Sequence, residues 1–329
     1  MFHFAQRCAG RGKHRRHFSQ RRQNRGSNDI ENPSASIFPG NWKIPAAIGF
    51  ALIGFLQWQH LNHPSDEERK KRPASALRRL PGENTAFEKT MATERQMQSL
   101  KLFPSRAVSR LWGQVHDKEL PRWMRKPVYK AWTAVFKCNL DEMKYPLDDY
   151  ANLSEFFSRP LKSNARSFDF AVNHLASPID APGDYHRIHA PTDWQVKERR
   201  HFPGNLFPVN HIAARLIPSL FVENERVALL GEWKHGFFSL TAVGALNVGS
   251  ITLAMEPNFG TNTAVHDKQL GHCFKNVYGV KMDAMRGEEM AQFKLGSTVV
   301  LVFEAPKSFQ FTVKLGDRVT LGNCIGEVD

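Results

Sequence analysis

Past residue 200 the sequence breaks into short runs rich in Val, Leu, Ile, Thr and Phe, and Gly punctuates them. This texture constrains the fold more than any other feature, because runs of this length and composition are typical of β-strands. The expected strands are 226–231, 237–244, 248–255 and 297–304, and a closing hairpin of 309–315 and 318–321 around Gly316 and Asp317. The C-terminal part is therefore predicted to be a β-rich body.

Helical periodicity dominates the stretch before this body. One apolar stripe consists of Val108, Leu111, Trp112 and Val115, which predicts one helix. Pro127 is expected to open a second helix, whose stripe is Val128, Ala131, Trp132, Val135 and Phe136. Core packing is the expected role of both stripes, whereas Trp123 and Met124, set among basic residues, suit either a core or a lipid surface. A third short helix is expected at 153–157, capped by Asn152 or Ser154. The predicted fold class is α+β.

The net charge of +13 is concentrated at the N-terminus. Residues 1–28 carry eight Lys or Arg residues and no acidic residue, so the rest of the chain is close to +5. An Arg-rich, acid-free start is typical of a mitochondrial targeting segment, here placed at 1–40. The alternative is a basic arm that binds RNA or anionic lipid. No RNA-binding motif follows it, so no nucleic-acid partner is expected.

An uncharged apolar run, IPAAIGFALIGFL, occupies residues 44–56 between Trp42 and Trp58. It is shorter than the ~18–20 residues that span a bilayer comfortably. Tryptophans at both ends suit the two membrane interfaces, so a single transmembrane anchor is predicted within 41–60. A buried core helix and a secretory segment are the alternatives. A polar linker, 61–99, is expected to follow and to be loosely ordered.

The segment FKLGSTVVLVFEAP, residues 293–306, has the chemistry for self-cleavage. Gly296 lacks a Cβ, which gives the backbone the freedom that attack on its carbonyl by the Ser297 hydroxyl requires. An acyl shift from nitrogen to oxygen followed by elimination would split the chain and convert Ser297 into a pyruvoyl group. The letters LGST alone would better suit a simple turn that leads into a strand.

Further segments of the sequence favour self-cleavage over a simple turn. The same segment, together with APGDYHRIHAPTDW at 181–194, RRHFPGNLFPVN at 199–210, NERVALLGEWKHGFFSLTAVGALNVGSI at 224–251 and LSEFFSRPLK at 153–162, resembles the phosphatidylserine decarboxylases. The resemblance covers residues 100–329 in order and is closest to the mitochondrial members. It implies a catalytic domain over 100–329 that is cut into a large membrane-bound chain and a small pyruvoyl chain.

The resemblance also implies roles for individual residues. Ser297, His189 and Asp180 match a self-cleavage relay in which the imidazole deprotonates the hydroxyl and the carboxylate orients the imidazole. His186 matches a histidine that serves the decarboxylation itself. The pair His186 and His189 has metal-ligand spacing, but it lacks the acidic residue of a zinc-protease frame, so no metal is expected.

The implied reaction decarboxylates phosphatidylserine to phosphatidylethanolamine through a Schiff base between the substrate amine and the pyruvoyl group at position 297. The implied partners are the lipid substrate, the bilayer and the chain's own cleaved fragment, with a homo-oligomer possible in principle. The implied location is the mitochondrial inner membrane, with the body in the intermembrane space.

One departure from the family stands out. In relatives, several tens of residues separate the element that holds the relay aspartate from the DYHxxH element. Here SPID runs directly into APGDYH, so Asp180 and His189 stand nine positions apart, and Ala181 replaces an expected Gly. The spacing favours an internal deletion, and the chain is expected to process poorly.

Two rival readings follow. One is a catalytically impaired, membrane-tethered short isoform of the same family that fails to self-process, and the other is a pyruvoyl-dependent decarboxylase of a soluble amino acid.

Overall fold

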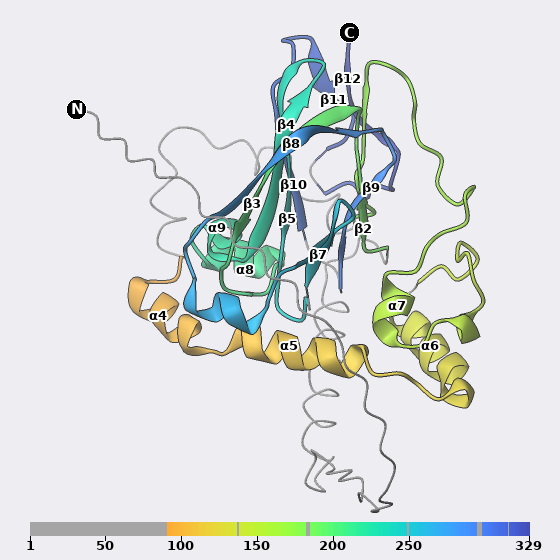
Figure 1. Ribbon diagram of the computed structural model, residues 1–329, viewed down its shortest axis with the longest axis vertical. Coiled ribbons are helices and arrows are strands. Elements are labelled where there is room, and N and C mark those ends of the chain that lie inside the picture. The colour runs from red at the N-terminus through yellow and green to blue at the C-terminus, as the bar shows by residue number, and fades with distance from the viewer. Residues whose placement is uncertain (1–90, 137, 182–184, 249, 295–297, 315) are drawn as a thin grey trace, which may run out of the picture. The chain divides into compact units, whose positions relative to one another are not determined.

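The computed structural model describes residues 91–329 except 137, 182–184, 249, 295–297 and 315 (Figure 1). All of the described residues belong to one compact unit, Asp66–Asp329. The targeting segment and the apolar run at 44–56 lie outside the described residues. Among the described helices, none is long and apolar enough to cross a membrane. The architecture is α+β, as predicted, with a helical part that precedes a β-rich body.

The helical part begins with α4 (Glu94–Leu102), α5 (Ser105–His116) and α6 (Arg122–Phe136). Helix α4 lies largely within the segment expected to be a loose linker. A capping box explains its start, because the Thr93 side chain accepts from the Gln96 backbone while the Gln96 side chain accepts from the Thr93 backbone. Figure 1 shows α4 and α5 along one end of the strands.

Helix α6 starts earlier than predicted. Pro127 lies inside this helix instead of opening it, since the helix begins at Arg122. After the 3₁₀ turn η2 (Leu147–Asp149) comes α7 (Leu153–Phe157). This helix has the predicted bounds, and its Asn152 side chain accepts from the Glu155 backbone as a cap. The Tyr129 ring of α6 stacks on the Phe156 ring of α7 at 4.7 Å, which joins the two helices in a small aromatic core.

Helix α5 departs in part from the expected burial. Its predicted core residues Leu111 and Val115 are 56% and 54% exposed, whereas Arg106, Ser109 and His116 are buried. The buried polar groups are hydrogen-bonded: the Ser109 hydroxyl, for example, accepts from the Asn247 backbone at 3.1 Å. Core packing was therefore a wrong prediction for Leu111 and Val115, whereas Val108 and Trp112 are half-buried. Specific polar bonds hold a neighbouring face of the helix against the body.

Three antiparallel sheets form the β-rich body. The five-stranded sheet has the order β10-β5-β4-β3-β8, the four-stranded sheet β2-β9-β6-β7, and the three-stranded sheet β1-β12-β11. The bounds of the first sheet are β3 Trp194–Phe202, β4 Arg226–Trp233, β5 Gly236–Val243, β8 Phe274–Ala284 and β10 Thr298–Phe303. The other strands are β1 His174–Ala176, β2 Arg187–His189, β6 Ile251–Leu253, β7 Glu256–Gly260, β9 Glu289–Phe293, β11 Phe309–Phe311 and β12 Cys324–Val328. Short helices α8 (His211–Leu216) and α9 (Leu220–Glu223) and the 3₁₀ turn η3 (Ala264–Lys268) fill the connections.

The predicted strands at 226–231 and 237–244 are confirmed as β4 and β5, and 297–304 as β10 from residue 298 onward. The predicted strand 248–255 is reduced to β6. The predicted closing hairpin is wrong, because β11 pairs with β12 and not with residues 318–321. Val319 instead forms an isolated bridge with Ala181. One large apolar core, which includes Ile188, Trp194, Phe238 and Phe293, packs the sheets together.

Candidate active site

The strand β2, which begins directly after His186 and ends at His189, lies beside the strand that leads to the candidate cleavage pair. β2 pairs with β9, with Arg187 opposite Gln292. The Phe293 backbone amide extends this pairing, since it donates to the His186 carbonyl at 2.9 Å. Gly296 and Ser297 themselves lie outside the described residues. The chain on either side of them is held at Lys294, whose amide donates to the Ser250 carbonyl at 2.9 Å, and at Thr298, which pairs with Val243.

The described residues on either side of the short join between Asp180 and His189 are hydrogen-bonded to each other. The His189 amide donates to the Pro178 carbonyl, and the Ala176 amide donates to the Pro191 carbonyl, both at 2.9 Å. Ala181 forms two backbone hydrogen bonds with Val319, which fits the extended conformation that the following proline imposes. The backbone therefore brings the aspartate segment close to the histidine strand even at this short spacing.

The Asp180 carboxylate, however, is engaged elsewhere. It accepts from the Arg166 guanidinium at 2.6 Å and from the Leu321 amide at 2.7 Å. Arg166 also pairs with Glu142 at 2.6 Å. Burial acts to lower the pKa of Arg166, but hydrogen bonds to the two carboxylates hold it above its ordinary value. Within the described residues, Asp180 and His189 do not hydrogen-bond to each other.

His189 takes its orientation from two other groups. Its Nδ1 lies 2.8 Å from the Gly287 carbonyl oxygen, and its Nε2 lies 2.8 Å from the Tyr185 hydroxyl. A carbonyl can only accept, so Nδ1 must carry the proton and Nε2 presents its lone pair to the hydroxyl. Burial lowers the pKa of His189, although the Gly287 bond and the Glu289 carboxylate oppose this shift. The imidazole is therefore neutral at neutral pH, as a general base must be.

His186 lies against an aromatic cluster that the sequence analysis did not assign to the site. Its ring lies 5.5 Å from the Phe157 ring, which also contacts His116 and Trp132. His116 is 2% exposed, and its Nδ1 lies 2.8 Å from the Trp112 carbonyl oxygen. Because a carbonyl only accepts, Nδ1 carries the proton and donates it to this bond. Burial lowers the pKa of His116. The cluster thus gives His186 an apolar wall formed by α5, α6 and α7.

Tyr185, the Gly287 carbonyl and Arg166 are the site groups that sequence reasoning missed. Tyr185 stands within the DYHRIH motif, so its position next to the histidines was a signal that could have found it. The other two approach from distant parts of the sequence and carry no local signal. Burial raises the pKa of Tyr185, so its hydroxyl stays protonated and donates.

Comparison with known proteins supplies a further finding. Residues 181–327 match the family model described as phosphatidylserine decarboxylase, and the match begins directly after Asp180. The mitochondrial phosphatidylserine decarboxylase proenzyme of Pongo abelii is 37% identical, over 69% of this chain and 73% of that protein. Proenzyme 1 of Oryza sativa subsp. japonica is 31% identical, over 87% and 89%, and proenzyme 1 of Saccharomyces cerevisiae is 33% identical, over 68% and 72%.

The alignment with the rice protein spans 400 positions, although this chain has 329 residues. The relative therefore contains positions that no residue of this chain matches.

Proposed function

Because this chain belongs to the phosphatidylserine decarboxylase family, we propose that it decarboxylates phosphatidylserine to phosphatidylethanolamine after cutting itself between Gly296 and Ser297. The observation that carries the proposal is the pairing of the His186 carbonyl with the Phe293 amide, which sets the two histidines beside the chain that leads to the cut. The strand that follows the cut, β10, is paired with β5 along its whole length.

In the proposed cleavage, Nε2 of His189 takes the proton of the Ser297 hydroxyl as the oxygen attacks the Gly296 carbonyl. The Gly287 carbonyl holds the imidazole in the tautomer that this step needs. Tyr185 must release Nε2 before the serine hydroxyl can use it. The orienting role that the family resemblance gives to Asp180 thus falls in part to a backbone carbonyl.

The cofactor of the proposed decarboxylation is the pyruvoyl group formed from Ser297, which would supply an electron sink for the pair left by carbon dioxide. The described flanks fit such a group, since Thr298 is fixed in a strand and His186, directly before β2, is bonded through its carbonyl to the Phe293 amide. We assign His186 to proton transfer at the reacting carbon. Its contact with the Phe157 ring would keep water from that side of the site.

The proposed substrate is a membrane lipid, and the helical part offers a surface to a bilayer. Leu102, Leu111, Val115 and Trp123 are exposed by 54% to 84%. A hollow of about 600 Å³ beside Trp123 is lined by Arg122, Arg125 and Lys126 together with two aspartates. Of these basic residues Arg122 and Lys126 are exposed, and exposed apolar side chains beside them favour the interface of an anionic membrane.

We also propose that residues 1–40 target the chain to mitochondria, that the run within 41–60 anchors it in the inner membrane, and that residues 100–329 form the catalytic domain in the intermembrane space. The relatives are named mitochondrial, which supports the first part. Protease should digest the body in mitoplasts but not in intact mitochondria. Digestion in intact organelles would overturn the placement.

A gel of the full-length chain tests the central proposal. Self-cleavage releases the 33 residues from 297 to 329, and Ser297→Ala should leave the chain uncut. Ser308→Ala, a hydroxyl removed from the same fragment, is the matched control and should cut like the parent chain. Two fragments from Ser297→Ala would overturn the assignment of the cleavage site.

An impaired short isoform remains the second candidate, and one observation favours it. Asp180 is bound to Arg166 and the Leu321 amide, not to the histidine. If the chain is impaired for this reason, a family-length segment inserted between Asp180 and Ala181 should restore cleavage. Efficient cleavage and lipid turnover by the chain as it stands would eliminate this candidate.

A further inference from the structure

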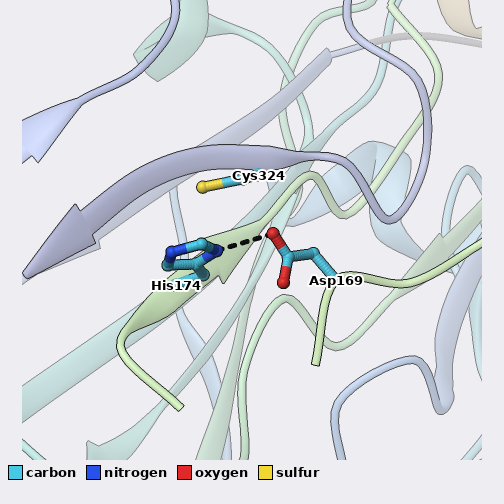
Figure 2. A group of neighbouring side chains, drawn as sticks. All are labelled: Asp169, His174 and Cys324. Carbon is cyan, nitrogen blue, oxygen red and sulfur yellow. Dashed lines mark hydrogen bonds and ion pairs between the residues drawn. The ribbon is translucent and has the colours of Figure 1, made fainter. Parts of the chain in front are cut away.

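Three side chains with different metal-ligating atoms converge on the three-stranded sheet. Asp169 lies in the loop before β1, His174 begins β1, and Cys324 begins β12 (Figure 2). One carboxylate oxygen, one imidazole nitrogen and the thiol sulfur all lie within 4.8 Å of one another. We propose that these residues form a site for a divalent transition-metal ion, with Zn²⁺ as the ion that best fits the donor set.

The imidazole is placed as a metal-ligating histidine requires. Nδ1 of His174 lies 2.6 Å from an Asp169 carboxylate oxygen, and Nε2 lies 3.3 Å from a Glu327 carboxylate oxygen. With Nδ1 on the metal, the Nε2–H donates to Glu327. Metal-bound histidines almost always donate their second N–H to such an acceptor, which fixes the ring and increases the basicity of the ligating nitrogen.

The backbone holds the three ligands in place before any ion binds. The Asp169 amide donates to the Gly322 carbonyl at 2.9 Å, which ties the loop to the turn before β12. The Arg286 guanidinium donates to the carbonyls of Asp169 and His174 at 2.6 and 2.8 Å. In the β1–β12 ladder, His174 lies opposite Glu327, and an irregularity in the register brings Cys324 opposite Ala176. Little ordering is therefore left for the ion to impose.

The donor set discriminates between metals. The Cys324 thiol donates a weak hydrogen bond to the Gly326 carbonyl at 3.3 Å. When the thiol ionises to bind a metal, this hydrogen bond is lost and a metal–sulfur bond replaces it. A thiolate with an imidazole favours zinc over magnesium or calcium, which prefer oxygen ligands. All three residues are half-buried, so a water molecule can complete a tetrahedral site.

A second convergence of ligand atoms, His201, Glu225 and His266, is unsuited to a cation. The Arg106 guanidinium already donates to the Glu225 carboxylate at 2.7 Å, and the Asn262 amide donates to both of its oxygens. A fixed positive charge occupies the place that a metal ion would need. Among the residues that the structure describes, no guanidinium is hydrogen-bonded to the Asp169 carboxylate, and the nearby Arg286 donates to the backbone carbonyls of Asp169 and His174 instead.

The proposed site has one consequence that rests on the proposed function. After a cut at Ser297, Cys324 would belong to the small fragment, while Asp169 and His174 would remain on the large one. A zinc ion would then link the two fragments through one strand pair, as an ion can link two segments of a single chain.

Cobalt substitution tests the site on the purified full-length chain. Co²⁺ bound by a thiolate gives a sulfur-to-metal charge-transfer absorption, and competing Zn²⁺ reports the zinc affinity. One equivalent should bind with this absorption. Cys324→Ser should abolish the absorption, whereas Cys273→Ser, which removes an exposed free thiol, should leave it intact. Glu327→Gln should weaken zinc binding by about 10–100-fold.

Absence of the absorption in the parent chain, its survival in Cys324→Ser, or its loss in Cys273→Ser would each overturn the proposal. The measurement does not depend on self-cleavage, because it can be repeated on the uncut Ser297→Ala chain. Metal binding with no processing would therefore support the site while it contradicts the proposed function.

Discussion

Arg106 of α5 holds a buried carboxylate, and its replacement by methionine should destabilise the body strongly. The Glu225 side chain is 1% exposed and that of Arg106 is 9% exposed. The guanidinium donates to Glu225 and to the Gly204 carbonyl, both at 2.7 Å, and its Nε donates to the more exposed Asp267, which Arg110 also binds. In Arg106→Met the carboxylate would keep its bonds to His201 and the Asn262 amide but would lose its countercharge.

The expected cost follows from this burial. Removal of one partner of a buried ion pair typically costs about 3–5 kcal/mol, since it leaves an uncompensated charge away from water. For a body of this size, such a loss lowers the melting temperature by about 6–20 °C. Urea unfolding monitored by tryptophan fluorescence would measure the free energy of unfolding, and calorimetry would measure the temperature.

Arg110→Met is the matched control. Arg110 lies one turn further along α5 and pairs with Asp267 at 2.6 Å, but the two side chains are 25% and 35% exposed. An ion pair at such exposure contributes about 1 kcal/mol or less. The double variant Arg106→Met/Glu225→Gln should recover part of the lost stability, because no charge is left buried. If Arg106→Met costs no more than Arg110→Met, or if the double variant is less stable than Arg106→Met, this reasoning is wrong.

Three further changes have defined outcomes. His116→Phe should reduce the loss of folding stability that occurs as the pH falls from 7 to 5, and urea midpoints across this range would measure the change. Burial lowers the pKa of His116 in the folded state, so the unfolded chain binds the proton first and stability falls as the pH falls. Gly231→Ala should cost at least about 2 kcal/mol of unfolding free energy, since a Cβ there would lie 1.8 Å from a backbone oxygen of β3, whereas Gly279→Ala, with open space around its Cβ, should cost little. Tyr185→Phe should speed self-cleavage about fivefold, because it frees Nε2 of His189 from one hydrogen bond of about 1 kcal/mol. A slower appearance of the fragments on a gel would contradict this prediction.

The strands and α7 could be predicted because their signals are local. Alternating or continuous apolar runs identified β4 and β5, and Asn152 identified the start of α7. The burial of α5 could not be predicted in this way. Its buried face depends on Glu225 and Asn247, which lie more than 100 positions away and bond to Arg106 and Ser109. An apolar stripe predicts a buried face only where no stronger polar contact selects the other side.

In the candidate site, too, local features could be predicted from the sequence and long-range contacts could not. The motif that contains His186 and His189 was visible in the sequence, and its strand does lie beside β9. The partners of each side chain were not visible, because Arg166 and the Gly287 carbonyl reach Asp180 and His189 through the packing of distant loops. The short join after Asp180 indicated an altered relay but not which group would bind the carboxylate instead.

The connection from β9 to β10 passes from the four-stranded sheet to the five-stranded sheet. A cut within a strand would break ladder hydrogen bonds, whereas a cut between Gly296 and Ser297 would fall between the end of β9 and the start of β10. The downstream piece would keep six residue pairs between β10 and β5 and its ladder between β12 and β1. Its new first residue would adjoin a strand already locked in register, so a reactive group formed there would stand on a rigid support from the moment it appeared.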